Sequence, residues 1–294
     1  RPRLRIDGAT GSAAQGGKFD VAQINAGAKF SFQLTWLGME AESDEITAVE
    51  CMLSALNAGI ICLGGQKSNG FGRVSLSVRK FMYDMTQAQA RKDWLNEKDC
   101  GLPLHLPEIQ DTSRVIFTLT GRTDSLLVKA ASAKRKDDRT ITGNLEESGR
   151  PVLPGSSVKG AVRSRAELIV RSTGRPEELV EELFGREARG NDQGKPGRVR
   201  FEDVYLDSAK SQRISRIRIN RFTGGVMRGG LFQEEPLCSE IKLEISAPAD
   251  QPIGCALLLY TLRDLALGLY NLGSGSSVGR GYLRVNQIAV KMPS

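Results

Sequence analysis

The chain has 294 residues, of which 40% are hydrophobic and 26% are charged, with a formal net charge of +7 and a pI of about 9.2. The length suits one large domain or two ordinary ones, and the composition excludes a disordered chain. No apolar run approaches the roughly 20 residues that a membrane-spanning helix needs, so we expect no membrane partner.

The cysteines and the histidine exclude further classes of protein. Five cysteines without a CxxC pair argue against a disulfide framework, and a reduced, cytoplasmic setting is expected. The single histidine, His105, makes a zinc site improbable, and we interpret it as a linker residue. The positive excess favours a polyanionic partner, and it lies after residue 110, because residues 1–110 hold 12 basic and 12 acidic side chains.

The chain opens on Arg1-Pro2-Arg3-Leu4-Arg5, without a methionine or the apolar core of a signal peptide, so we expect the native N-terminus to lie further upstream. One block then occurs twice. Residues 3–20 and 216–233 align without a gap. The first copy begins Arg-Leu-Arg-Ile and the second Arg-Ile-Arg-Ile, and in both a Thr-Gly pair and then a Gly-Gly pair follow at the same spacing. Each copy continues through an alternating strand, an amphipathic helix and a glycine-rich loop that leads into a strand. In the first copy these are residues 29–34, 45–58 and 64–74, and in the second they are 240–245, 255–270 and 273–285.

Only the second copy has the upstream half of a domain. Residues 114–121 predict a strand, 134–150 a polar loop, 161–171 a helix with Ser156 or Ser157 as its N-cap, and 198–206 a second strand. Together with the repeat, the order is β-α-β-β-α-β. The prediction is therefore an α+β, ferredoxin-like (RNA-recognition-motif-like) fold with two domains in tandem, each bearing a projecting hairpin. We expect the second half of a first domain in residues 1–90, a linker in 91–112 and a complete second domain in 113–294.

The start of the helix near residue 156 carries an anion-binding pattern. In Pro154–Gly160, backbone N–H groups, the hydroxyls of Ser156 and Ser157 and the Lys159 amine lie at a helix N-terminus. Arg163 follows Lys159 by four residues and shares its helix face, whereas Arg165 points elsewhere. A row of cations suits a run of phosphates, and the alternative is an ordinary capped helix with a solvated basic face.

The glycine-rich loops and the excursions between strands are the other candidate contacts. The loops end in Phe71 with Arg73 and in Tyr282 with Arg284, which suits base stacking and phosphate binding, although the aromatic side chains alternatively pack in the core. The excursions 8–18 and 221–231 are long enough to project as hairpins. Val226 and Met227 near one tip form an exposed apolar pair, which is unusual unless it touches a partner.

These motifs resemble the RAMP superfamily of CRISPR proteins, and within it the Cas-seven-type backbone subunits of type III effector complexes. The resemblance rests on residues 153–164, 182–185, 218–225 and 279–282. Two units in tandem are similar to the fused double backbone subunits of type III-D-like systems, or to part of the fused type III-E effector.

The resemblance implies a guide-RNA-binding subunit of a CRISPR ribonucleoprotein, with target RNA and other effector subunits as partners and a role in antiviral defence. Such subunits hold the guide backbone and push a thumb-like hairpin, here 222–231, between bases of the guide–target duplex. The RNA-binding residues expected on this basis are Ser156, Ser157, Lys159, Arg163, Arg221, Phe222, Thr223, Met227, Arg280, Arg5, Lys18, Lys67 and Arg73.

Some relatives also cleave target RNA with a loop aspartate, which makes Asp137 or Asp138 the candidate catalytic residue and Asp124 a weaker one. The family's glycines before that aspartate are replaced here by a basic sequence ending in Lys136, which puts cleavage in doubt. A catalytic subunit would use Mg²⁺ or another divalent metal ion, or the carboxylate would take the 2′-hydroxyl proton.

Three alternatives stay open at this point. The first is a non-catalytic RNA-binding scaffold. The second is a guide-processing RAMP endoribonuclease, disfavoured because the only histidine precedes the complete domain. The third is a basic interaction protein that binds no RNA.

Overall fold

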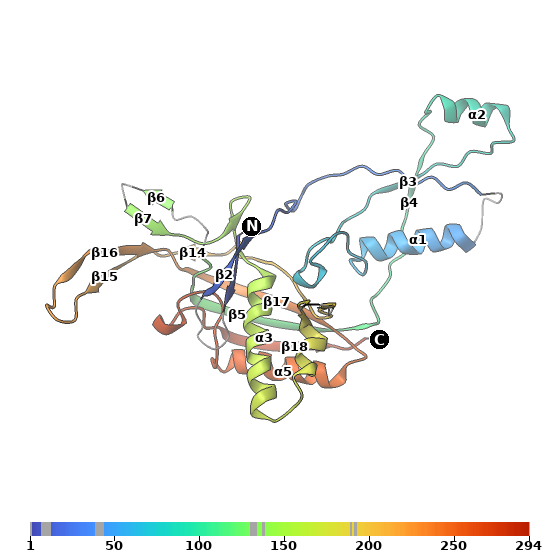
Figure 1. Ribbon diagram of the computed structural model, residues 1–294. Coiled ribbons are helices and arrows are strands. Elements are labelled where there is room, and N and C mark those ends of the chain that lie inside the picture. The colour runs from blue at the N-terminus through green and yellow to red at the C-terminus, as the bar shows by residue number, and fades with distance from the viewer. Residues whose placement is uncertain are drawn as a thin grey trace. The chain divides into compact units, whose positions relative to one another are not determined.

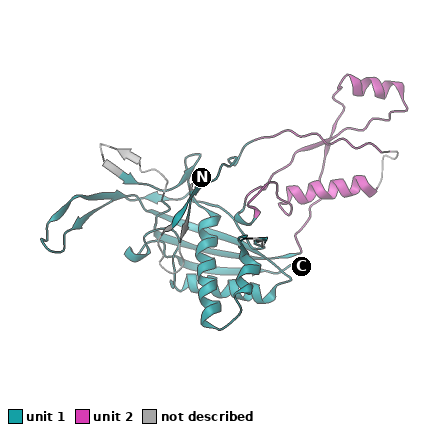
Figure 2. Ribbon diagram, in the orientation of Figure 1, with its two compact units in different colours: residues 1–28, 68–70, 113–294 teal, residues 29–67, 71–112 magenta. Residues whose placement is uncertain are grey.

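The computed structural model describes residues 2–6, 13–38, 44–129, 134–136, 139–188, 190 and 193–293. The chain forms two compact units (Figure 2). Unit 1 comprises residues 1–28, 68–70 and 113–294, and unit 2 comprises residues 29–67 and 71–112. Of the helices that the structure describes, none has the length and apolar character needed to cross a bilayer.

The central sheet of unit 1 is antiparallel, with the strand order β12-β17-β5-β18. The strands are β5 (Arg114–Leu126), β12 (Arg200–Phe201), β17 (Leu237–Pro248) and β18 (Arg284–Lys291), with β14 (Lys210–Ser211) also paired to β17. The middle strand β5 pairs along its length with β17 on one side and β18 on the other. With a helix after the first and third of the four main strands, this is the predicted ferredoxin-like plan, and the α+β class is confirmed.

Helices α3 (Gly155–Ser172), α4 (Glu178–Phe184) and α5 (Pro252–Ala266) contribute to the core that covers one face of this sheet (Figure 1). Strand β5 turns Val115, Phe117 and Leu119 into the core, each less than 3% exposed, because alternate side chains point to the same face. Helix α3 buries its apolar stripe from Val158 to Val170 against them. Helix α5 begins three residues before the predicted start because Pro252 fits its first turn.

A second sheet carries the projecting hairpin, in the order β15-β16-β7-β6. Its strands are β15 (Ile214–Ile219), β16 (Val226–Glu234), β6 (Lys134–Lys136) and β7 (Arg139–Thr142). The prediction of a structureless loop over residues 134–150 is therefore wrong. The segment is polar and lacks an alternating pattern, but β7 pairs with the edge of β16, and such pairing is a tertiary effect that periodicity does not reveal.

Strands β1 (Pro2–Ile6) and β2 (Ala13–Asp20) form the hairpin of the first copy of the repeat, which matches the β15–β16 hairpin of the second copy. In β1–β2, Arg3 lies opposite Phe19 and Ile6 opposite Ala13. In β15–β16 the equivalent residues lie opposite each other in the same way, Arg216 with Phe232 and Ile219 with Val226. The irregularity in register also falls at the same place, one residue before the last pair. The gapless repeat of residues 3–20 is thus confirmed as a structural repeat.

Unit 2 holds the helix of the first copy and its glycine-rich loop except for residues 68–70. Its elements are α1 (Asp44–Asn57), β3 (Val78–Lys80), α2 (Ala88–Leu95) and β4 (Leu102–Leu104), with β3 paired to β4, and the short helix η1 (Lys67–Asn69) spans its boundary with unit 1. The predicted strand over residues 29–34 is not formed, because no described strand pairs with it. The stretch expected as a linker, 91–112, contains the end of α2 and all of β4.

Short strand pairs complete unit 1. Strand β9 (Arg150–Leu153) pairs with β8 (Glu146–Glu147) and with β13 (Val204–Tyr205), and β10 (Gly185–Arg186) pairs with β11 (Lys195–Pro196). The short helix η2 (Ser276–Val278) lies in the second glycine-rich loop. The single strand predicted over 198–206 is instead β12 and β13, which pair with different neighbours.

Candidate RNA-binding site

Helix α3 begins at Gly155 with Pro154 at the N-cap, two to three residues before the predicted cap, so neither Ser156 nor Ser157 is the cap. The Gly155 N–H donates to the Asp203 carboxylate at 2.7 Å. A side chain at Gly155 would collide with the Phe201 carbonyl, so the glycine permits this close approach. The first N–H of the helix is thus already bound to a carboxylate of the chain and is not free for an external anion.

Lys159, one turn into α3, lies in a cationic cluster. Its amine donates to the Ser68 hydroxyl at 3.0 Å, and Ser68 belongs to the glycine-rich loop of the first copy. The pKa of Lys159 is lowered to about 8. The main cause is burial of the amine, and the positive charges of Arg163 and Arg3 add to it. Lys159 makes no ion pair with any residue that the structure describes. This group of three cations, Arg3, Lys159 and Arg163, is called the α3 cation cluster below.

Arg163 and Arg165 have different surroundings on α3. Arg163 donates to the Glu167 carboxylate at 2.9 Å and to the Gly185 carbonyl at 3.0 Å, so the main chain fixes its direction. Arg165 points away from the cluster, as the sequence predicted, and its partner is the buried Asp264 of α5 at 2.8 Å. Burial alone would raise the pKa of Asp264, but hydrogen bonds from Arg263 and Arg165 more than offset it, and the pKa is lowered.

The β15–β16 hairpin, which we call the thumb, presents an apolar tip. The Asn220 side-chain oxygen accepts hydrogen bonds from the N–H groups of Phe222 at 2.8 Å and Thr223 at 3.2 Å, which fixes the turn. Phe222 is 99% exposed, and Val226 and Met227 beside it are also exposed. A ring held in solvent by a structured turn contributes nothing to the buried core, and its exposed faces suit stacking on a base.

The thumb is also basic. Arg213 and Arg216 near its base pair with Glu235 and Glu234, respectively. By contrast, three exposed arginines toward the tip form no ion pair with any residue the structure describes. They are Arg218, Arg221 and Arg228. Unpaired exposed guanidinium groups beside an exposed ring are the combination that nucleic-acid-binding surfaces use.

Arg280 is placed inside the fold. It is 2% exposed, and its guanidinium lies 2.7 Å from the Glu234 carboxylate at the base of β16. This burial leaves no access to RNA, so the structure gives Arg280 the task of holding the thumb against the glycine-rich loop. The sequence did not reveal this because Glu234 and Arg280 are distant along the chain.

The loop with the candidate catalytic aspartates joins the thumb sheet. Asp137 and Asp138 lie outside the described residues, but the strands on either side are described. β7 runs parallel to β16, and Ile141 pairs with Gln233 near the thumb base. Arg139 therefore lies at the end of β7 nearer to the thumb tip, with Lys136 opposite it. At the other end, the buried Asn144 accepts from the Val128 N–H at 2.9 Å and donates to the Glu235 carbonyl, which fixes the loop to the thumb base.

Asp124, the weaker catalytic candidate, lies between two arginines. The Arg122 guanidinium donates to it at 2.7 Å, and Arg284 lies 2.9 Å from its other oxygen. The hydrogen bond from Arg122, supported by the charge of Arg284, lowers the pKa of Asp124. A carboxylate held ionised in this way is a weak proton acceptor.

The remaining predicted contacts lie in several places. Lys18 is exposed on β2, and Arg5 lies in β1 with its side chain outside the described part. Lys67 and Arg73 are exposed and belong to unit 2. The Thr223 hydroxyl accepts from the Gly225 N–H and so supports the thumb turn.

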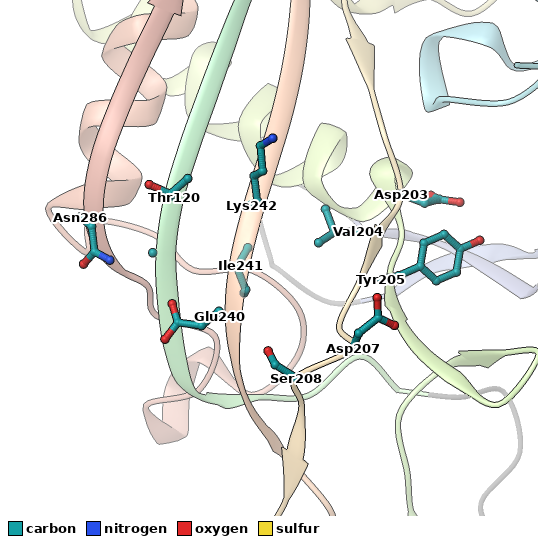
Figure 3. A pocket seen from close by; sticks show the side chains of 11 residues that line it. Thr120, Asp203, Val204, Tyr205, Asp207, Ser208, Glu240, Ile241, Lys242 and Asn286 are labelled. Carbon is teal, nitrogen blue, oxygen red and sulfur yellow. The ribbon is translucent and has the colours of Figure 1, made fainter.

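A shallow pocket of about 510 Å³ opens beside β5, β13 and β17 (Figure 3). Its lining includes Asp203, Asp207 and Glu240. Asp207 is held by two bonds of 2.7 Å from Arg150, which lower its pKa, and Arg150 stacks over Tyr205. The lining also includes Lys242, but its carboxylates outnumber this one cation, which makes the pocket a poorer place for a phosphate than the α3 cation cluster.

No group of three or more histidine, cysteine or acidic residues suited to a metal ion occurs among the residues that the structure describes. Sequence reasoning missed Arg3, Asn144, Asn220 and Asp203. Only Asn220 had a local signal, as an asparagine two residues before a turn that ends in Thr-Gly-Gly. The others act on residues far along the chain.

Comparison with known proteins gives one match. The sequence profile of the RAMP superfamily matches residues 1–75 and 139–284, which is well over half of the chain and includes both copies of the repeat. No curated protein matches the chain. The chain therefore belongs to the RAMP superfamily of CRISPR-associated, RNA-binding proteins, with the family's units arranged in tandem.

Proposed function

We propose that the chain is a guide-RNA-binding backbone subunit of a type III CRISPR ribonucleoprotein, with the α3 cation cluster holding the guide backbone and the thumb inserted into the guide–target duplex. The observation that carries this proposal is the state of Lys159. It is half-buried, two further cations lie beside it, and its pKa is about 8.

Such a cluster is unfavourable by itself, because like charges repel and burial opposes the charged amine. Arg163 is already paired with Glu167, but Lys159 has no ion pair with a described residue, so an RNA phosphate at this place would supply Lys159 with the negative charge that it lacks. Because the contact is with phosphate, it carries no base information, as a subunit that accepts any guide sequence requires.

The test is the binding of a labelled single-stranded RNA to the full chain, followed by fluorescence anisotropy over a range of salt concentrations. Lys159→Met should weaken binding about tenfold and reduce the salt dependence by about 0.7 in the slope of log K against log salt, one phosphate contact on a single strand. Lys242→Met is the matched control, because Lys242 is exposed on β17 beside the acidic pocket. Equal binding by both variants would exclude the cluster as a phosphate site.

A second proposed function, cleavage of the target RNA, rests on the attachment of β7 to the thumb strand β16. A thumb that displaces a base leaves the neighbouring 2′-hydroxyl free to align with its phosphorus, and a carboxylate nearby accelerates the reaction by accepting the proton. A divalent metal ion, if one binds, would stabilise the negative charge that develops on the phosphate.

Asp137→Ala and Asp138→Ala, made separately, test this function in the assembled complex with labelled complementary RNA and Mg²⁺. Loss of the required carboxylate should slow cleavage by about 10²-fold or more while binding of guide and target persists. Glu240→Ala, at an exposed carboxylate in the acidic pocket, is the control. Wild-type cleavage by both aspartate variants would leave the subunit as a scaffold.

A further inference from the structure

The extended segment of residues 29–38 in unit 2 exposes an apolar face. Phe30, Phe32 and Leu34 are 74%, 60% and 57% exposed, and Trp36 continues the same alternation at 49%. Side chains that alternate along an extended chain share one face, so these four form a single apolar row.

The repeat shows what covers such a row. The equivalent residues of the second copy are Ile241, Leu243, Ile245 and Ala247 in β17, and each of them is at most 3% exposed. β17 reaches this state because β5 pairs with it along eleven registered positions and because α3 and α5 cover the face. The first copy has the counterparts of β17 and α5 but no described counterpart of β5 and α3.

The strand after the glycine-rich loop shows the same deficiency. In the second copy β18 follows the loop and pairs with the other edge of β5. In the first copy the residues at this place contain only β3, which pairs with β4 instead. β5 is the strand between β17 and β18, so the element with no counterpart among the described residues of the first copy is the central one.

Helix α1 has a matching uncovered face. Thr261 and Leu257 of α5 are buried, whereas their counterparts on α1, Met52 and Ala48, are exposed. In the second copy α3 packs on α5 through Arg165 and Asp264 and through the shared core. The helix that follows the missing strand would therefore cover α1.

We infer that residues 29–38 and α1 form a docking surface for a strand–helix segment outside residues 1–294, with the strand inserting beside residues 29–36 in antiparallel register and the helix covering α1. The occupant has defined chemistry: an extended strand with alternate apolar residues, like β5, followed by an amphipathic helix, like α3. A second copy of this chain does not provide it, because its own β5 and α3 are already buried in unit 1. The inference concerns assembly and is independent of the proposed role in RNA binding.

Hydrogen–deuterium exchange tests the inference on two chains. In the first, the full chain alone, amides 30–36 should exchange with almost no protection while those of 241–247 are strongly protected. The second chain has residues 113–213 joined ahead of Arg1, which supplies a strand and helix of the required kind in the order that the repeat uses. Amides 30–36 should then exchange about 10²-fold more slowly or better, and the Trp36 fluorescence should shift to shorter wavelength.

The matched control carries Phe117→Asp in the added segment alone, which removes the apolar face of the added strand. Protection in the extended chain but not in this control supports the inference. Protection of residues 30–36 in the unextended monomer, or none in the extended chain, overturns it. Protection that appears only with concentration, together with a dimer in sedimentation, shows instead that a second copy occupies the surface.

Discussion

The two copies of the repeat form the same local structures in different surroundings. Their hairpins share one register, and their glycine-rich loops share a short 3₁₀ turn and a hydrogen bond from the N–H of Leu63 or Leu272 to the carbonyl of the last glycine of the loop. The loops also share left-handed residues at matching positions, where Gln66 of the first loop takes the place of Gly275 in the second. Among the described residues, only the second copy has β5 and only there is the apolar face of the strand buried, while α1 buries Leu53 but leaves Met52 exposed. Local sequence thus suffices for turns and helices, whereas the strands require a central partner.

The largest effect should come from the same substitution at equivalent strand positions. Leu243→Asp puts a carboxylate into the core of unit 1 and should lower the free energy of unfolding by more than about 4 kcal/mol. Phe32→Asp, at the equivalent exposed place, should change it by no more than about 0.5 kcal/mol. Urea denaturation followed by circular dichroism measures both, and equal losses would mean that the first copy is packed after all.

The loops offer a comparison between neighbouring glycines. Gly281 has φ +76°, and a Cβ there would collide with the Leu272 carbonyl, whereas Gly279 has φ +79° with open space around it. Gly281→Ala should therefore cost about 3 kcal/mol or more, and Gly279→Ala only the backbone penalty of about 1 kcal/mol. Thermal denaturation of the two variants checks this, and similar melting temperatures would contradict the close approach.

The buried pair Arg280–Glu234 is specific to the second copy, since the first has Phe71 and Val21 at these places. Arg280→Phe leaves the Glu234 carboxylate without its main partner and should cost about 3 kcal/mol. The double variant Arg280→Phe with Glu234→Val copies the first pair and should recover most of that loss. A double-mutant cycle in urea measures the coupling, and additive losses would show that the two side chains act independently.

The sequence predicted the elements whose signals are local. The repeat, β5, α1, α5, the thumb and the order of the ferredoxin-like domain followed from periodicity and glycine spacing. The strand over 29–34 was predicted from the same alternation that is correct in β17, and it fails because its partner is lacking among the described residues. β6 and β7 were missed for the converse reason, since a polar segment pairs with an available strand edge.

The candidate site divides in the same way. Lys159 and Arg163 were found because spacing by four places both on one helix face. Arg3 joins them from the far end of the chain, and Asp203 takes the first N–H of the helix from a segment about fifty residues later, so neither has a local signature. Arg280 was expected to bind RNA from the resemblance of residues 279–282, whereas in the structure it is buried beside Glu234, which lies far along the chain.

The smallest effect concerns the stability that Lys159 costs. Its pKa in the folded chain is about 8, below the value of 10.5 for the free side chain, so below pH 8 folding must keep a charged amine in an unfavourable place. Lys159→Met should therefore raise the free energy of unfolding at pH 7, by about 1–2 kcal/mol once solvent screening is allowed for. Between pH 8 and 10.5 the unfolded chain binds one more proton than the folded chain, so the stability of the wild type rises with pH relative to that of Lys159→Met. Above pH 10.5 the charge-related advantage of the variant has disappeared. Urea denaturation at pH 7, 9 and 11 measures this, with Lys242→Met as the control that shows no such trend.

Lys159→Met would then be more stable than the wild type at pH 7 yet bind RNA less well, which is the combination expected of a lysine placed for a ligand. A variant less stable than wild type at pH 7 would show that the hydrogen bond to Ser68 outweighs the repulsion, and that the cluster is a structural feature.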